Sequence, residues 1–250
     1  LKMKSQKQLA GVYLSMGIDS YKAKKPDEAI QYLSESFNYA ELIGDTKGMG
    51  KANKLLGGVY SYKGKVALKQ KDFAASADFL NKSLEYYPDT DEYYYLVYAY
   101  SKNKDEANMK AAMDKLIEMG GNDNEDVQKA KSIVSKFYLA EAVEAAKVQN
   151  YSSVVDIITK SLAYNDKDPL AYYYLATAYN SQKQYDKAIQ AAETGVALEK
   201  KDPSNFYFEA AKGYEGLGKN DKACENYKKV TGGPNLEAAK YQISTVLKCK

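Results

Sequence analysis

Residues 171–190 read AYYYLATAYNSQKQYDKAIQ, and an earlier stretch, EYYYLVYAY at 92–100, carries the same tyrosine triplet before a leucine. Counting from Tyr172, apolar residues stand at the third, fourth, seventh and sixteenth positions, which are Leu175, Ala176, Tyr179 and Ala188. The first three of these positions share one face of an α-helix. The stretch therefore predicts a helix with one apolar face, followed by a second helix that packs against it.

The same spacing recurs along the chain. Six tyrosines begin a copy of it, and we call each the origin of its copy: Tyr13, Tyr60, Tyr93, Tyr138, Tyr172 and Tyr207. Sixteen positions after the origins stand Ala29, Ser76, Met109, Val154, Ala188 and Ala223, and four positions further on stand Leu33, Leu80, Met113, Ile158, Ala192 and Tyr227. Because a pair of helices cannot bury both faces alone, neighbouring pairs must stack. We expect the origins and both of these later sets to form the core.

This pattern resembles the tetratricopeptide repeat, a helical hairpin of 34 residues. The best matches are YYLATAY with YDKAIQAA, YFEAAKGYEGLGKNDKACENY and YLSMGIDSYKAKKPDEAIQYL. Met109 stands where the family has a small residue, and Glu141 where it has leucine. The resemblance implies an all-α fold, an alpha-alpha superhelix or solenoid of about six such hairpins with about thirteen helices. Residues 235–250 would be the C-terminal capping helix.

Two longer intervals interrupt the regular spacing, around ELIGDTKGMGKANK and MGGNDNEDVQKAK. We predict three units in residues 1–120 and three in residues 121–250, joined in one continuous superhelix. Gly120 and Gly121 are the candidate hinge between them.

Composition excludes several classes of function. The net charge is only +3 and all 36 basic residues are lysine, which argues against a nucleic-acid binder because no arginine fork is present to read bases. The absence of histidine removes Ser-His-Asp and Cys-His nucleophiles and histidine-bearing zinc sites. The acidic run at 122–126 lacks the spacing of a calcium loop, and GLGK at 216–219 lacks a phosphate-loop frame. We expect no catalysis, no metal and no cofactor.

The two cysteines, Cys224 and Cys249, are 25 residues apart and have no metal-binding or CxxC spacing. We favour two separate core thiols, with a disulfide that holds the C-terminal helix as the alternative.

The residue after each origin, and the residue four positions later, belong to the face that lines the concave groove in the family that this chain resembles. We call these positions the inner face. They are Leu14, Ser61, Tyr94, Leu139, Tyr173 and Phe208, followed by Ile18, Lys65, Tyr98, Val143, Thr177 and Lys212. Contiguous exposed apolar residues mark binding surfaces, although these residues could also pack on one another. The predicted binding residues are Leu14, Ile18, Lys65, Tyr94, Tyr98, Leu139, Val143, Tyr173, Phe208 and Lys212.

Four lysines stand nine positions after their origins: Lys22, Lys69, Lys102 and Lys147. Lysine near a helix C-terminus interacts favourably with the helix dipole, which is the reading we favour. A basic rail for an acidic peptide is the alternative. The carboxylate clamp of chaperone-binding members of the family needs lysine and asparagine where this chain has Leu14 and Ile18, or Tyr173 and Thr177. That subfunction is therefore not expected.

The resemblance implies a non-catalytic scaffold that binds a protein or an extended peptide in its groove. A self-associating structural protein and a glycan or small-ligand binder are the alternatives. No run of residues is long and apolar enough for a membrane span. The arginine-free composition resembles that of bacterial proteins, and we expect export to the periplasm or cell envelope with a removed signal. The sequence does not decide the partner or the oligomeric state.

Overall fold

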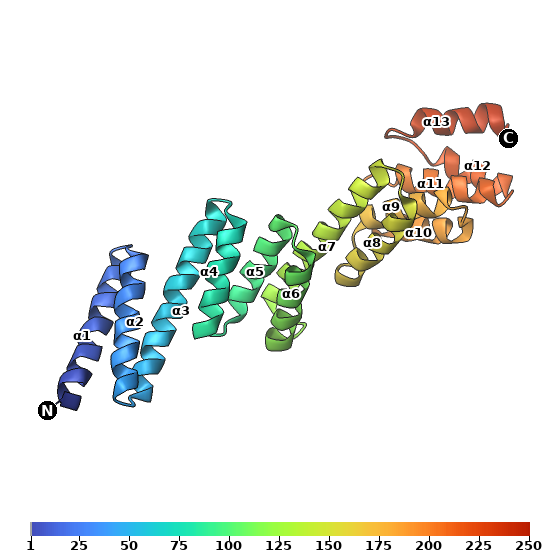
Figure 1. Cartoon of the computed structure of the whole chain (residues 1–250). Helices are drawn as coiled ribbons and strands as arrows, with labels where there is room; N and C mark the ends of the chain where they lie inside the picture. The colour runs from blue at the N-terminus through green and yellow to red at the C-terminus, as the bar shows by residue number, and fades with distance from the viewer. Residues whose placement is uncertain (1) are drawn as a thin grey trace. The chain divides into compact units, whose positions relative to one another are not determined.

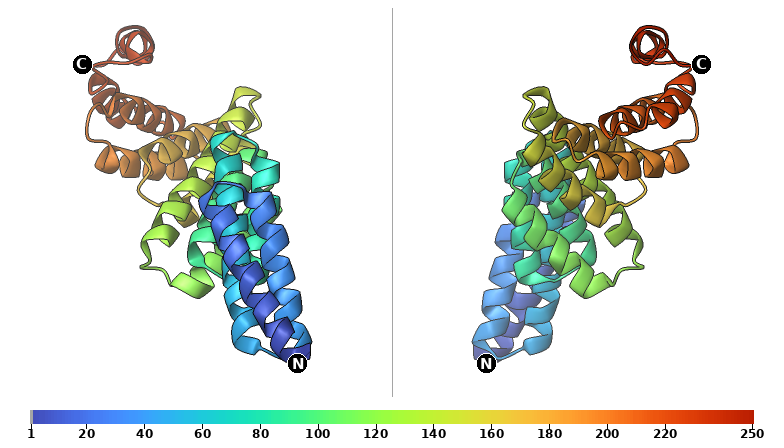
Figure 2. Two further views of the ribbon diagram at one scale, coloured as in Figure 1. Left: turned by 90° about the vertical axis from the view of Figure 1, so that its left-hand side faces the viewer. Right: turned by 90° about the vertical axis from the view of Figure 1, so that its right-hand side faces the viewer.

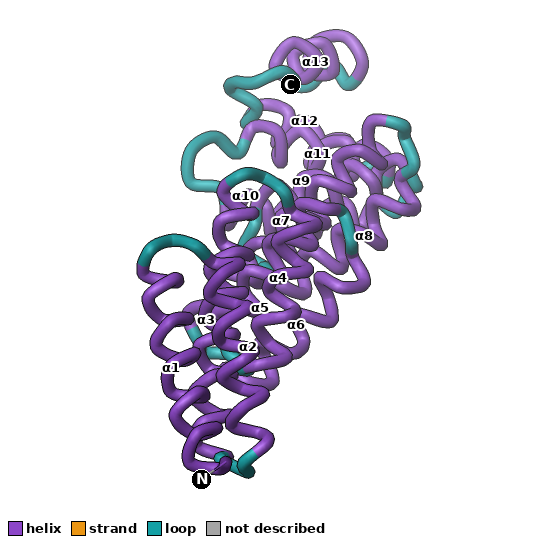
Figure 3. Tube along the Cα trace, turned by 60° about the vertical axis from the view of Figure 1, so that its left-hand side comes forward, coloured by secondary structure: helices purple, strands orange, loops and turns teal. Residues whose placement is uncertain are grey.

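The computed structural model describes residues 2–250, and in this range every regular element is a helix (Figure 3). The helices are α1 (Lys2–Lys22), α2 (Pro26–Leu42), α3 (Thr46–Lys69), α4 (Phe73–Tyr86), α5 (Thr90–Asn103), α6 (Glu106–Gly120), α7 (Glu125–Lys147), α8 (Tyr151–Tyr164), α9 (Pro169–Ser181), α10 (Tyr185–Leu198), α11 (Ser204–Gly216), α12 (Asn220–Lys228), α13 (Leu236–Tyr241) and the π-helix η1 (Gln242–Val246). The prediction of an all-α fold with about thirteen helices is confirmed. None of the helices in residues 2–250 has the length and apolar character that a membrane crossing requires.

The chain divides into two compact units, Leu1–Ile133 and Val134–Lys250. In the first unit, α1 packs on α2, α3 on α4 and α5 on α6, while α2 contacts α3 and α4 contacts α5. In the second unit, α9 packs on α10, α11 packs on α12, and α10 contacts α11. Figures 1 and 2 show α1 and α2 running side by side as such a pair. Each unit is therefore a stack of helical hairpins. The predicted division at residues 120 and 121 stays a prediction.

The positions sixteen and twenty residues after the origins are confirmed as the core. All twelve side chains are at most 1% exposed. Gly17 and Gly64 lie opposite Leu33 and Leu80, and a Cβ at either glycine would stand within 2.7 Å of the leucine side chain. The two helices of these hairpins approach so closely that only glycine leaves room for the leucine.

The origin tyrosines were expected in the core, and for five of the six this is wrong. Only Tyr138 is buried, at 4% exposure. In three copies the origin ring instead stacks on a tyrosine twenty-six positions later, with ring centroids 5.6, 5.7 and 6.2 Å apart: Tyr13 on Tyr39, Tyr60 on Tyr86 and Tyr138 on Tyr164. For Tyr13 and Tyr60, which are partly buried, the stack covers the ring without enclosing the whole side chain in the core.

A buried serine joins the two helices in the same three hairpins. Its hydroxyl donates to a main-chain carbonyl twenty-six residues earlier: Ser36 to Ala10 at 2.9 Å, Ser83 to Gly57 at 2.9 Å and Ser161 to Ser135 at 2.8 Å. A buried hydroxyl must be hydrogen-bonded, so this contact fixes where the helices cross. This twenty-six-residue spacing is present in the sequence.

The turn between the two helices of each hairpin contains a left-handed residue at one fixed position, eleven after the origin. These residues are Lys24, Lys71, Lys104, Gln149, Lys183 and Gly218, with φ between 57° and 72°. The left-handed conformation ends a helix and suits glycine, yet only the sixth copy has glycine there. The other five copies therefore hold a side chain in an unfavourable backbone region.

Replacing Lys71 with glycine is expected to raise the free energy of unfolding by ~0.5 to 1 kcal/mol, because relief of the left-handed penalty exceeds the entropy lost from the unfolded chain. Lys71→Val is expected to lower it, since a β-branched residue tolerates this region least. Urea unfolding followed by circular dichroism measures both changes. Equal stability of the three proteins would contradict the assigned turn.

The C-terminal cap differs from the single amphipathic helix that was expected. Leu247 N donates to Gln242 O at 2.9 Å, five residues back, which is the hydrogen bond of a π-helix. The wider turn changes the register of the residues that follow, so that Val246 is 48% exposed while Ile243 and Leu247 pack on the core around Ala239. The apolar side of the cap therefore excludes Val246.

Cys224 and Cys249 form a disulfide, with their Cα atoms 5.7 Å apart. The favoured prediction of two separate core thiols is wrong, and the alternative is correct. The chain after η1 returns to α12, which brings the second cysteine within the distance that a disulfide spans. The covalent bond attaches the cap to the last hairpin.

Candidate binding site

The predicted binding residues are divided between the two units. Leu14, Ile18, Lys65, Tyr94 and Tyr98 lie in the first, and Leu139, Val143, Tyr173, Phe208 and Lys212 lie in the second. All are partly buried except Leu139, which is 8% exposed and packs in a core cluster with Ala142.

A pocket of about 400 Å³ lies between α3 and α5, and we call it the three-tyrosine pocket. Its lining is Lys65, Leu68, Lys69, Tyr94, Tyr95 and Tyr98. The structure thus brings together three of the predicted residues of the first unit. Tyr95, which completes the YYYL triplet, was not among the predicted binding residues, and the triplet itself is the signal that indicates it. The Tyr94 and Tyr95 rings meet edge to face with centroids 5.2 Å apart.

The electrostatics of the three-tyrosine pocket are set by a buried acid. The Lys65 ammonium lies 3.6 Å from Oε2 of buried Glu92 and 4.6 Å from the centre of the Tyr95 ring. Its charge is therefore largely balanced inside the protein. Lys69 is exposed and has no ion pair among the described residues, and Lys102 lies over the Tyr98 ring at 5.4 Å. The result is an apolar, aromatic pocket with a basic rim.

A second pocket of about 620 Å³, the C-terminal pocket, lies in the second unit. Asn180 of α9, Tyr185 of α10, Tyr227 of α12 and Gln242 of η1 line it. Helix α11 contributes the lining residues Phe208, Lys212, Glu215 and Gly216. A Cβ at Gly216 would stand 2.4 Å from the Tyr185 ring, so glycine is what allows the ring to lie there.

Hydrogen bonds hold the polar groups of the C-terminal pocket. Tyr227 donates to Oε2 of Glu215 at 2.8 Å. The Lys212 ammonium donates to Oε2 of buried Glu209 at 3.1 Å, and Asn180 Nδ2 donates to the same oxygen of Glu209 at 2.8 Å. Burial, and then the Glu215 carboxylate, raise the pKa of the Tyr227 hydroxyl, which therefore stays a neutral donor.

The other predicted residues take part in packing. Leu14 packs against the core cluster that contains Leu33 and Leu56. The Tyr173 ring meets the Phe206 ring edge to face at 6.2 Å, and burial raises the pKa of its hydroxyl. Ile18 and Val143 are partly buried.

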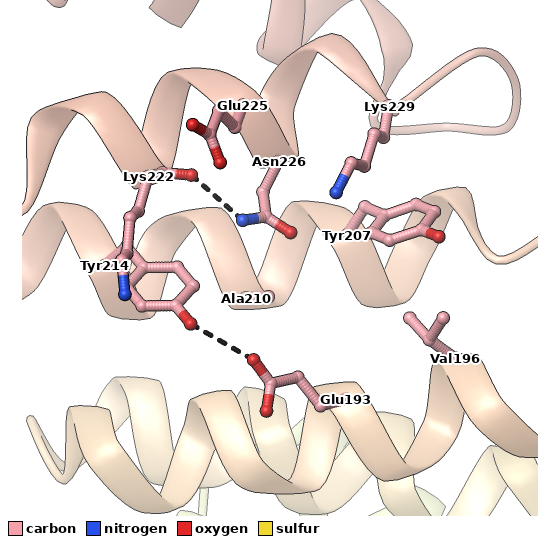
Figure 4. A pocket seen from close by; sticks show the side chains of 9 residues that line it. All are labelled: Glu193, Val196, Tyr207, Ala210, Tyr214, Lys222, Glu225, Asn226 and Lys229. Carbon is pink, nitrogen blue, oxygen red and sulfur yellow. Dashed lines mark hydrogen bonds between the residues drawn. The ribbon is translucent and has the colours of Figure 1, made fainter.

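A third hollow of about 330 Å³ lies on the opposite face of α11, the face that carries the origin Tyr207 (Figure 4). Tyr214 donates to Glu193 at 3.1 Å, and Asn226 donates to the main-chain oxygen of Lys222 at 2.9 Å. Lys229 lies 5.3 Å from the centre of the Tyr207 ring.

The row of four lysines is explained by helix ends. Lys22, Lys69, Lys102 and Lys147 all stand in the last turn of their helices, α1, α3, α5 and α7. Cations are favourable at this end of a helix dipole. The reading of these lysines as C-terminal helix residues is confirmed.

The acidic run before α7 is a helix cap. Oδ1 of Asn124 accepts from the main-chain N–H of Asp126 at 2.8 Å and of Val127 at 3.3 Å. This satisfies amides that the first helical turn leaves unpaired. No group of three or more acidic, histidine or cysteine side chains in residues 2–250 is placed to hold a metal ion.

Comparison with known proteins gives one short sequence relative and several solved structures. TPR repeat-containing protein YpiA of Bacillus subtilis (strain 168) is 32% identical over 65 residues, which is 26% of this chain and 15% of that protein's length. A crystal structure of MamA protein matches at 20% identity with a TM-score of 0.46, covering 76% of this chain and 96% of MamA. YrrB, described as a TPR protein with an unusual peptide-binding site, matches at 13% identity with a TM-score of 0.43, covering 74% of this chain and 91% of YrrB.

The model of the tetratricopeptide repeat family matches residues 157–190, which run from α8 into α10. The match covers one repeat length, and the hairpins before and after it share its buried positions. The resemblance seen in the sequence is confirmed for residues 157–190, which match the tetratricopeptide repeat model, and the described residues fold into helical hairpins of the expected kind.

Proposed function

We propose that the protein is a non-catalytic scaffold that binds an extended segment of a partner protein on the inner face of its first unit. The observation that supports this most strongly is the three-tyrosine pocket, where Tyr94, Tyr95 and Tyr98 leave an open apolar hollow beside Lys65 and Lys69. Tyrosine rings are rigid, lose little entropy on binding and are common at the centres of protein interfaces.

The chemistry of the pocket specifies the segment that it binds. An apolar or aromatic side chain fills the hollow, because the lining is mostly rings and the stem of Leu68. Acidic residues next to that side chain face Lys69 and Lys102, which stand at the rim in the last turns of α3 and α5. Lys65 contributes less attraction, since Glu92 already balances it.

We also propose that the protein acts in an oxidising compartment of a bacterium, the periplasm or cell envelope. The disulfide between Cys224 and Cys249 supports this, because disulfides persist in oxidising surroundings and are rare in reducing ones. The oligomeric state is left to measurement of the solution mass at several concentrations.

Peptides selected from a random library on the full chain test the proposed function. Tyr94→Ala and Tyr98→Ala are each expected to weaken the affinity for the selected peptide by about tenfold to a hundredfold, as the loss of an interface aromatic does. Isothermal titration calorimetry measures the affinity. Tyr87→Ala is the matched control, because Tyr87 belongs to the first unit, is 45% exposed and does not line the pocket.

The outcomes separate the candidate functions. Equal affinity of all three variants, with each folded by circular dichroism, would move the site off the three-tyrosine pocket. The glycan binder would be favoured if no peptide is selected, if the protein binds a glycan array, and if Tyr94→Ala abolishes that binding. A mass that rises with concentration would favour self-association.

A further inference from the structure

Two buried hydrogen-bond acceptors in the C-terminal pocket have no donor. They are Oδ1 of Asn180 and Oε1 of Gln242, and both residues line the hollow. Asn180 is only 8% exposed, and its Nδ2 is fully used by two bonds to Glu209, at 2.9 Å to the carbonyl and 2.8 Å to the carboxylate. A buried acceptor without a donor costs ~1 to 3 kcal/mol, which a ligand with N–H groups would recover.

The charges around the pocket favour a cation. The pocket and its immediate surroundings contain two carboxylates, those of Glu209 and Glu215, but one ammonium, that of Lys212. Lys212 is held by both oxygens of Glu209, at 3.1 and 3.2 Å, so its charge is already balanced. Tyr227 occupies Oε2 of Glu215, and Oε1 has no donor among the described residues. The unbalanced charge of the pocket is therefore negative and lies on Glu215.

The remaining lining is aromatic. Tyr185, Phe208 and Tyr227 surround the hollow, and the Phe208 and Tyr227 rings meet edge to face at 5.6 Å. Ring faces attract cations and cover apolar stems. An ammonium group on an alkyl chain satisfies every part of this lining, with its N–H groups on the acceptors and its stem against the rings.

We propose that the C-terminal pocket binds a protonated primary amine on an apolar stem, in the form of a lysine side chain of a bound segment. Glu215 supplies the countercharge, Asn180 and Gln242 accept N–H bonds, and the three rings cover the stem. The source of the lysine rests on the proposed scaffold function, but the recognition of the amine does not. The pocket has room for the side chain, since it measures about 620 Å³.

An anion is the opposite choice, and the geometry disfavours it. A carboxylate of a ligand would compete with Glu209 for Lys212 and would lie near Glu215. It would also leave the acceptors on Asn180 and Gln242 without donors.

Nuclear magnetic resonance of the ¹⁵N-labelled full chain tests the proposal with three probes: the Nα-acetyl, N-methylamide derivatives of lysine, norleucine and glutamate. The lysine derivative is expected to shift the side-chain amide signals of Asn180 and Gln242 in a saturable way. The norleucine derivative, which has the stem without the charge, is expected to bind at least about tenfold more weakly. Equal binding of the two, or stronger binding of the glutamate derivative, would overturn the proposal.

Variants locate the amine. Glu215→Gln keeps an acceptor for Tyr227 and is expected to weaken binding of the lysine derivative about tenfold. The control is Glu225→Gln, on α12 and outside the C-terminal pocket, which is expected to leave that binding unchanged. Gln242→Met removes one acceptor with little change of shape and is expected to weaken it several-fold. If Glu215→Gln does not fold, the test rests on Gln242→Met. Unchanged binding of the lysine derivative by the folded variant overturns the proposal. These probes need no partner segment, so their result is independent of the peptide experiment on the three-tyrosine pocket.

Discussion

Replacing Leu80 with alanine is expected to lower the free energy of unfolding by ~3 to 4 kcal/mol, because the side chain is fully buried and truncation leaves a cavity. Its neighbour across the helix contact is Gly64, which has no side chain to move into the space. Replacing the origin of the same copy, Tyr60, is expected to cost only ~1 to 2 kcal/mol, since that ring is partly buried and loses one stack and one lysine contact. Urea unfolding measures both.

The order of these two losses tests the register of the hairpin. Asp78→Ala, an exposed change in the same helix as Leu80, is the control and is expected to change stability little. A larger loss at Tyr60 than at Leu80 would place the tyrosine in the core and would contradict the packing described here.

Removal of the disulfide, in the double variant Cys224→Ser with Cys249→Ser, is expected to lower the stability of the second unit by ~3 kcal/mol. The bond closes a loop across 25 residues, which restricts the unfolded chain, and it holds the cap against α12. Thermal unfolding followed by circular dichroism measures the change.

Reductant provides the control for the disulfide. Wild-type protein treated with reductant is expected to match the double variant, and the double variant itself is expected to be insensitive to reductant. Wild-type stability that is unchanged by complete reduction, shown by labelling of two free thiols, would contradict a stabilising role of the bond.

Spacing alone predicted the second helix of every hairpin correctly. Ala188 and Ile158 are fully buried at the expected offsets because helix contacts tolerate only certain sizes at certain positions, and this restriction is visible in sequence. The origin tyrosines were misplaced for a physical reason. A tyrosine has an apolar ring and a polar hydroxyl, so the same residue suits a core or a rim, and the deciding partner, such as Tyr39 for Tyr13, stands in another helix.

The candidate site was predictable only in part. Equal offsets identified Tyr94 and Tyr98 correctly as neighbours, because the two residues share one helix face. Glu209 stands three residues before Lys212, a spacing that a helix brings together. Glu92, the partner of Lys65, lies in another helix and was not predictable from offsets. The π-turn of the cap, which begins at Gln242, has no distinct sequence signature.

The most direct test of the proposed function is ring-labelled tyrosine spectroscopy of the full chain with a selected peptide. Signals of Tyr94, Tyr95 and Tyr98 are expected to shift on binding, because their rings line the three-tyrosine pocket. Signals of Tyr60 and Tyr86, which stack on one another in the preceding hairpin, are expected to stay in place. Shifts at Tyr60 and Tyr86 with unchanged signals from the pocket would contradict binding on the inner face.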